Sequence, residues 1–154
     1  MKANLFVALA ASGLLLAGTA SAQEKKIKRS DLPPAVEKTV AAQSAGATIK
    51  GFSTEKENGQ TIYEAEMTVN GHSKDISMAA DGSIVEIEEQ VALDSLSPEV
   101  KAGLQAKAGK GTILKVESLT KKGKLVAYEA KVDTNGKKSE VQVGPDGKPL
   151  DHEE

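Results

Sequence analysis

The chain has 154 residues and no cysteine, which excludes a disulfide framework and thiolate chemistry. Its 20 basic and 22 acidic residues give a formal net charge of −2, and this mild, mixed balance argues against nucleic acid or an anionic membrane as a partner. Only 3% of the residues are aromatic, so few side chains can serve as anchors of a tight protein interface.

The first 22 residues have the pattern of a secretory signal peptide. Lys2 supplies the charged start, an apolar run follows over residues 5–16, and residues 20–22 form the small-residue cleavage site Ala-Ser-Ala. The apolar run is too short to cross a membrane comfortably. We therefore predict cleavage before Gln23, a periplasmic or secreted protein, and no membrane association after cleavage.

After the signal, a basic stretch over residues 23–31 is predicted to be a flexible leader. The remaining sequence repeats itself. The segment at 32–36 returns at 96–100, Tyr-Glu-Ala at 63–65 returns at 128–130, and Asp-Gly at 81–82 returns at 146–147. This self-similarity predicts two units of about 60 residues each, which span residues 32–91 and 92–154.

Each unit is predicted to begin with a helix. Pro34 and Pro98 suit the first helical position, and Ser97 suits an N-cap. Apolar residues then recur at a spacing of four, at positions 36 and 40 and again at positions 100 and 104. This spacing predicts one narrow buried stripe on each helix.

Strands are predicted after each helix, because Asn-Gly at 70–71 and Asp-Gly at 81–82 are typical hairpin turns between alternating segments. A two-residue loop at each turn pairs Ile76 with Ala65 on one side and with Ile87 on the other. The apolar residues then share one face of the sheet, so register and hydrophobic pattern agree.

The same rule pairs Met78 with Val85 in the first unit and Val143 with Leu150 in the second. Leading strands near residues 48–54 and 112–119 complete each set. The predicted fold class is therefore α+β, with two tandem repeats, each a helix packed on an antiparallel sheet of about four strands.

This order of signals resembles the PepSY-like family, a group described as similar to a β-lactamase inhibitor protein. The resemblance is carried by Leu-Pro-Pro-Ala-Val at 32–36, Tyr-Glu-Ala at 63–65 and the closing segments 80–88 and 145–150, and it covers about residues 32–152. It implies an exported bacterial protein built from helix-on-sheet tandem repeats, with an inhibitory or protein-binding role. It carries over no catalytic residues, and a shared fold is weak ground for function.

The residues themselves argue against an enzyme and against a nanomolar inhibitor. No Ser lies in a Gly-x-Ser-x-Gly frame, and neither a Walker loop nor a His-Glu-x-x-His helix is present. His72 and His152 stand alone in polar surroundings and are expected to be exposed. The aromatic residues after the signal are Phe52, Tyr63 and Tyr128, and both tyrosines fall on the predicted core face. We predict no enzymatic activity and no cofactor.

The outward face of the first unit gathers acidic residues. The predicted register places Asp75 between Glu66 and Glu88, and the adjacent row holds Glu64, Ser77 and Glu86. One interpretation is a solvated sheet face, screened by lysines such as Lys50 and Lys74. The other is a surface for an unknown protein or basic peptide, or for divalent cations, which prefer carboxylate oxygens. The predicted patch comprises Glu64, Glu66, Asp75, Glu86 and Glu88.

From these observations we predict an exported, non-enzymatic, protein-binding module, inhibitor-like in type, that binds neither nucleic acid nor membrane. The alternative is a low-affinity divalent-cation-binding or cation-sensing protein that uses the acidic sheet face.

Overall fold

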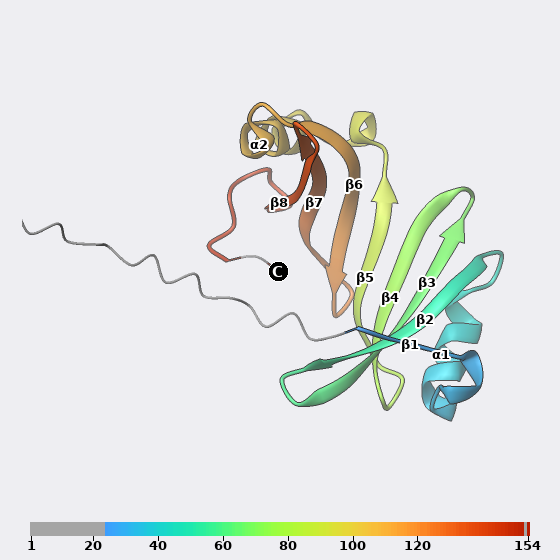
Figure 1. Cartoon of the computed structure of the whole chain (residues 1–154). Helices are drawn as coiled ribbons and strands as arrows, with labels where there is room; N and C mark the ends of the chain where they lie inside the picture. The colour runs from blue at the N-terminus through green and yellow to red at the C-terminus, as the bar shows by residue number, and fades with distance from the viewer. Residues whose placement is uncertain (1–23, 153) are drawn as a thin grey trace, which may run out of the picture.

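The computed structural model describes residues 24–152 and residue 154 (Figure 1). The predicted signal peptide, residues 1–22, lies outside the described residues. In the described part of the chain, the strands form one antiparallel sheet whose spatial order follows the chain from β1 to β8. The elements are β1 (Lys25–Ile27), α1 (Pro34–Gln43), β2 (Thr48–Glu57), β3 (Gln60–Val69), β4 (His72–Ala79), β5 (Ile84–Val91), α2 (Pro98–Ala108), β6 (Thr112–Lys121), β7 (Lys124–Thr134) and β8 (Lys137–Val143), with short 3-10 turns η1 (Arg29–Asp31) and η2 (Leu93–Ser95).

The predicted fold class, two repeats that each have a sheet of their own, is wrong. β5 and β6 pair along their length, from Glu86 opposite Lys121 to Val91 opposite Val116, so the sheet is continuous. Two separate sheets would leave the N–H and C=O groups along one edge of each without partners. Pairing β5 with β6 satisfies those groups and joins the two halves of the chain.

Two predicted strand pairs also fail. A β-bulge between Ser77 and Met78 shifts the register, so Met78 faces Ile84 rather than Val85. After β8 the chain forms a tight turn, in which Gly144 N donates to Lys148 O at 2.8 Å, instead of a further strand. The predicted pairing of Val143 with Leu150 is therefore absent.

Both helices cover the same face of the sheet. Ile87 packs against the apolar cluster under α1, and Val91 packs against the cluster under α2. These two residues lie on one side of β5, because alternate residues of a strand share a face. The predicted helical stripes are confirmed: Val36, Val40, Val100 and Leu104 are buried, with at most 2% of their surface exposed. Ser97 caps α2 as predicted, since its hydroxyl accepts a hydrogen bond from Val100 N at 3.3 Å.

The structure orders most of the stretch that the sequence predicts to be a flexible leader. Lys25–Ile27 forms β1, with Ile27 opposite Phe52 on β2. Arg29 then forms a bidentate ion pair with Glu37 on α1. Its Nη2 donates to Glu37 Oε1 at 2.7 Å and its Nε donates to the same carboxylate. Edge pairing and this bidentate ion pair hold the segment on the fold. No helix among the described residues is long and apolar enough to cross a membrane.

Candidate binding face

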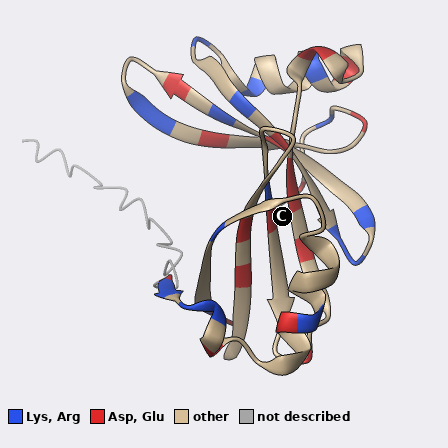
Figure 2. Ribbon diagram, turned by 90° about the vertical axis from the view of Figure 1, so that its right-hand side faces the viewer, with Lys and Arg blue, Asp and Glu red and all other residues tan. Residues whose placement is uncertain are grey.

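The predicted acidic residues lie on β3, β4 and β5, which are neighbouring strands of the sheet, and Figure 2 marks acidic positions in red along such strands. They alternate with apolar residues of the cluster under α1, so they lie on the sheet face opposite the helices. The predicted register is confirmed here. Asp75 lies opposite Glu66 on β3 and opposite Glu88 on β5. Ser77 lies opposite both Glu64 and Glu86, which forms the second predicted row. Alternation along each strand therefore brings all the predicted carboxylates onto one surface.

The pairing of β5 with β6 adds two carboxylates that the predicted patch does not include, Glu117 and Glu129. Glu117 on β6 lies opposite Gln90 on one side and opposite Glu129 on the other. The hairpin signals gave no information on this pairing, because β5 and β6 are separated by η2 and α2. We use the term acidic face for the full set: Glu64, Glu66, Asp75, Glu86, Glu88, Glu117 and Glu129.

Burial of polar groups distinguishes this face from an ordinary solvated sheet surface. Ser53 and Glu117 are each 1% exposed and Gln142 is 7% exposed, although both helices lie on the other side of the sheet. Their register partners, Glu64 and Glu129, are half-buried. The acidic side chains are therefore partly withdrawn from water, which normally disfavours a charged carboxylate.

Burial raises the pKa of several of these carboxyl groups. The pKa of Glu64 is raised to about 7, chiefly by burial and then by the charge of Asp75, against a hydrogen bond from the Ser53 hydroxyl. The pKa of Glu88 is raised to about 8, chiefly by burial and then by Glu86, Glu117 and Glu129. Burial is also the largest cause that raises the pKa of Asp75 and of Glu129.

Three lysines provide the nearby positive charge. Lys115 Nζ lies 2.5 Å from Glu117 Oε1, Lys131 Nζ lies 3.6 Å from Glu117 Oε2, and Lys121 Nζ lies 3.3 Å from Glu86 Oε2. The predicted screening by Lys74 is wrong, because Lys74 lies on the helix side and pairs with Glu89 at 3.1 Å. These three lysines lie on β6 and β7, so the positive charge is located where the acidic face extends onto the strands of the second half of the chain.

The C-terminal residue also reaches this side of the sheet. Glu154 N donates to Gln142 Oε1 at 2.8 Å, and Lys121 Nζ lies 3.4 Å from Glu154 Oε2. Lys121 Nζ also lies 3.3 Å from Glu86 Oε2, so Glu154 approaches the row Glu64, Ser77 and Glu86, whereas these contacts do not involve the row Glu66, Asp75 and Glu88.

Aromatic side chains are absent from the acidic face in the described part of the chain. Tyr63 and Tyr128 pack against the clusters under α1 and α2, as predicted, and Phe52 is buried in the first cluster. His72 and His152 are exposed, also as predicted. A tight interface usually depends on aromatic or Arg anchors, so this face is suited to charge-driven recognition instead.

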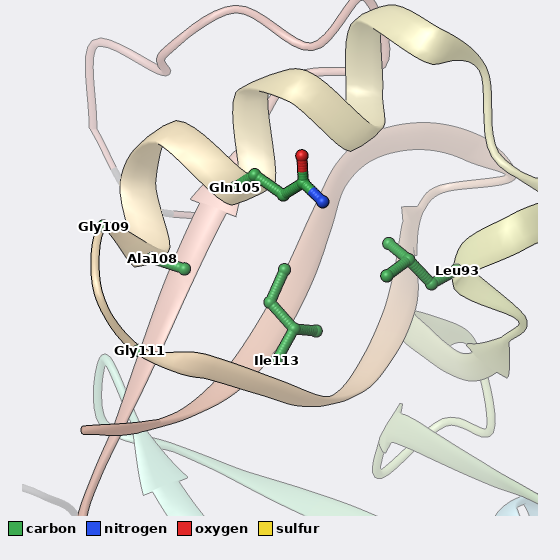
Figure 3. Close-up of a pocket in the computed structure, with 6 residues that line it drawn as sticks. All are labelled: Leu93, Gln105, Ala108, Gly109, Gly111 and Ile113. Atoms are coloured by element: carbon green, nitrogen blue, oxygen red, sulfur yellow. The ribbon is translucent and has the colours of Figure 1, made fainter. Parts of the chain in front are cut away.

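A hollow on the helix side offers different chemistry (Figure 3). It lies between the end of α2 and the start of β6, where Gln105, Ala108, Leu93 and Ile113 point toward one another. Its lining contains no ionisable side chain. It therefore holds neither an acid–base group nor a charged metal ligand, and the acidic face remains the candidate site.

Comparison with known proteins shows the fold. No family model matches the chain, and no curated protein matches it in sequence. Solved structures that resemble it include a DUF2874 family protein from Bacteroides ovatus ATCC 8483, with a TM-score of 0.59 and 20% identity over 77% of this chain and 84% of that chain. A BLIP-like protein from Bacteroides fragilis NCTC 9343 has a TM-score of 0.55 and 19% identity over 75% and 81%.

A further solved structure, from Bacteroides eggerthii DSM 20697, bears the description "putative periplasmic proteins". It matches with a TM-score of 0.62 and 17% identity, over 77% of this chain and 86% of that chain. The chain therefore shares its fold with these Bacteroides proteins, one of which is BLIP-like. At this level of identity the likeness concerns the fold alone.

Proposed function

We propose that this chain is an exported, non-enzymatic binding protein of PepSY-like type that binds a basic peptide segment through the acidic face. The observation that supports this proposal best is the continuous row Glu66, Asp75 and Glu88 across three neighbouring strands. Export is supported by the signal-like N-terminus and agrees with the periplasmic description of one protein that has the same fold.

Electrostatic repulsion within the face is the physical reason to expect a cationic partner. Like charges that lie directly opposite each other on neighbouring strands destabilise a sheet. Partial burial adds to this cost, as the raised pKa values of Glu64 and Glu88 indicate. A Lys-rich or Arg-rich segment would remove the repulsion and replace lost hydration with charge-assisted hydrogen bonds.

The composition of the face also suggests what kind of binding to expect. Without exposed aromatic anchors, most of the attraction must come from charge, which salt screens. We therefore expect moderate affinity, fast association and strong dependence on ionic strength, rather than the tight complex of an enzyme inhibitor.

A labelled oligolysine peptide tests this proposal by fluorescence anisotropy at low and at high salt. We expect saturable binding that weakens as salt rises, and Glu66→Gln should weaken it further. The matched control is Glu89→Gln, which removes the same charge from the opposite face of the sheet. Equal binding by the two variants, or no binding by the unmodified protein, would show that the acidic face does not recognise basic peptides.

A second candidate function is divalent-cation binding on the same face. One specific feature favours it, the buried carboxylate of Glu117 beside Asp75 and Glu88. Oxygen-rich clusters of this kind are typical ligands of hard divalent cations.

A further inference from the structure

We propose that Asp75, Glu88 and Glu117 together bind one divalent cation of the hard, oxygen-preferring class, for which Ca²⁺ is the probe. One carboxylate oxygen from each residue can be chosen so that all three atoms lie within 4.8 Å of one another. Ligand oxygens at about 2.4 Å from a shared Ca²⁺ lie no more than about 4.8 Å apart, so the observed spacing fits. This proposal names the ligands for the second candidate function, and it does not depend on peptide binding.

Glu117 is the observation that separates this cluster from ordinary surface acids. Its side chain is only 2% exposed, and its Oε2 atom has no hydrogen-bond partner. The other oxygen, Oε1, is satisfied by Lys115 and by the Ser73 hydroxyl, which donates to it at 3.3 Å. A buried carboxylate oxygen without a partner is costly and rare in folded proteins. A cation held by the three carboxylates would supply the missing partner, because Ca²⁺ binds a carboxylate through one or both of its oxygens.

Lys131 is the residue that a bound cation must displace. Its ammonium lies 3.6 Å from Glu117 Oε2, too far for a hydrogen bond, and 3.6 Å from Glu140 Oε1. The Lys131 side chain is 45% exposed, so it can turn toward Glu140 alone while Lys115 keeps its contact with Glu117. We therefore expect Lys131 to compete with the cation, and its removal to strengthen cation binding.

The three ligands come from three successive strands, β4, β5 and β6. Asp75 and Glu88 face each other across β4 and β5, whereas Glu117 joins them only through the pairing of β5 with β6. A bound cation would therefore link the first half of the sheet to the second, and it should stabilise the folded chain by mass action.

Calorimetric titration of the full protein with CaCl₂, and separately with MgCl₂, tests the proposal. We expect saturable Ca²⁺ binding to one site in the unmodified protein and in Glu89→Gln, the charge-matched change on the other face of β5. Glu88→Gln should weaken Ca²⁺ binding about tenfold or more, since it removes one of the three carboxyl ligands. Lys131→Gln should bind Ca²⁺ more tightly than the unmodified protein does.

Thermal unfolding with and without Ca²⁺ shows whether each variant is folded and gives a second measure of Ca²⁺ binding. At the same Ca²⁺ concentration, Ca²⁺ should raise the melting temperature of the unmodified protein and of Glu89→Gln more than that of Glu88→Gln. The cation site is refuted if neither the unmodified protein nor Lys131→Gln gives saturable heat, or if Glu88→Gln and Glu89→Gln lose Ca²⁺ affinity equally. Oligolysine binding that persists in either case would leave the peptide-binding proposal standing.

Discussion

At the scale of single residues, several carboxyl groups of the acidic face have a raised pKa, because burial and neighbouring carboxylates disfavour the ionised form. Glu64 illustrates the balance, because burial and Asp75 raise its pKa while the Ser53 hydroxyl lowers it. Glu24 and Glu66 add smaller effects in the same direction as burial. The folded protein therefore holds protons on this face under conditions where free carboxyl groups would have lost them.

This proton retention predicts a dependence of stability on pH. The pKa of Glu64 is about 7 in the folded protein, against an ordinary value of 4.5, so folding favours its protonated form. The stabilisation is full below about pH 4.5 and is lost as pH rises through about 7. Urea unfolding at a series of pH values should show stability falling over this window, with a shallower fall in Glu64→Gln. An identical slope in both proteins would contradict the assignment.

At the scale of elements, each helix packs against a turn that contains a glycine. The turn at Gly82 lies under α1, where the Thr39 hydroxyl donates to Gly82 O at 2.7 Å. The turn at Gly147 lies under α2, and a Cβ atom there would be 2.2 Å from Glu99 O. Gly147 also has a φ of +77°, which glycine adopts without strain. A side chain at this position would clash with α2 and displace the helix from the turn.

A pair of glycine substitutions tests this contact. Gly136 is the matched control, since its φ of +84° is similar but a Cβ atom there meets nothing within 4 Å. Gly136→Ala should cost about 1 kcal/mol of unfolding free energy from backbone strain alone. Gly147→Ala should cost at least about 2 kcal/mol more, because it adds the clash with α2. Equal costs from urea unfolding would show that α2 does not depend on this turn.

At the scale of the whole molecule, one continuous sheet carries two apolar clusters. The cluster under α1 includes Met67 and Ile76, and the cluster under α2 includes Leu104 and Val132. β5 connects them, since Ile87 packs on the first and Val91 on the second. Loss of either cluster would expose an edge of the shared sheet. We therefore expect the two halves to unfold together.

Two single-tyrosine proteins can measure this cooperativity. The chain has two tyrosines and no tryptophan, and each tyrosine packs on a different cluster. Tyrosine fluorescence therefore reports the second half in Tyr63→Phe and the first half in Tyr128→Phe. In each variant, the urea midpoint from fluorescence should coincide with the midpoint from far-ultraviolet circular dichroism. Separate midpoints would show that β5 and β6 part before the sheet unfolds.

The sequence by itself determined those features that depend on neighbours along the chain. The turn at Asn70-Gly71 has positive φ at both residues, 50° and 86°, as a two-residue hairpin requires. Such a turn sets the strand register, so Glu66 opposite Asp75 follows from the sequence alone. The helical stripes and the Ser97 cap are local in the same sense.

Only the tertiary structure decided how the two halves meet. The pairing of β5 with β6 spans α2, so no turn sets its register, and satisfaction of backbone groups at the strand edges favours it instead. This pairing makes one sheet from two expected ones and brings Glu117 beside Asp75 and Glu88. The acidic row is thus encoded in local turns, whereas the buried carboxylate beside it arises from a contact that local sequence cannot specify.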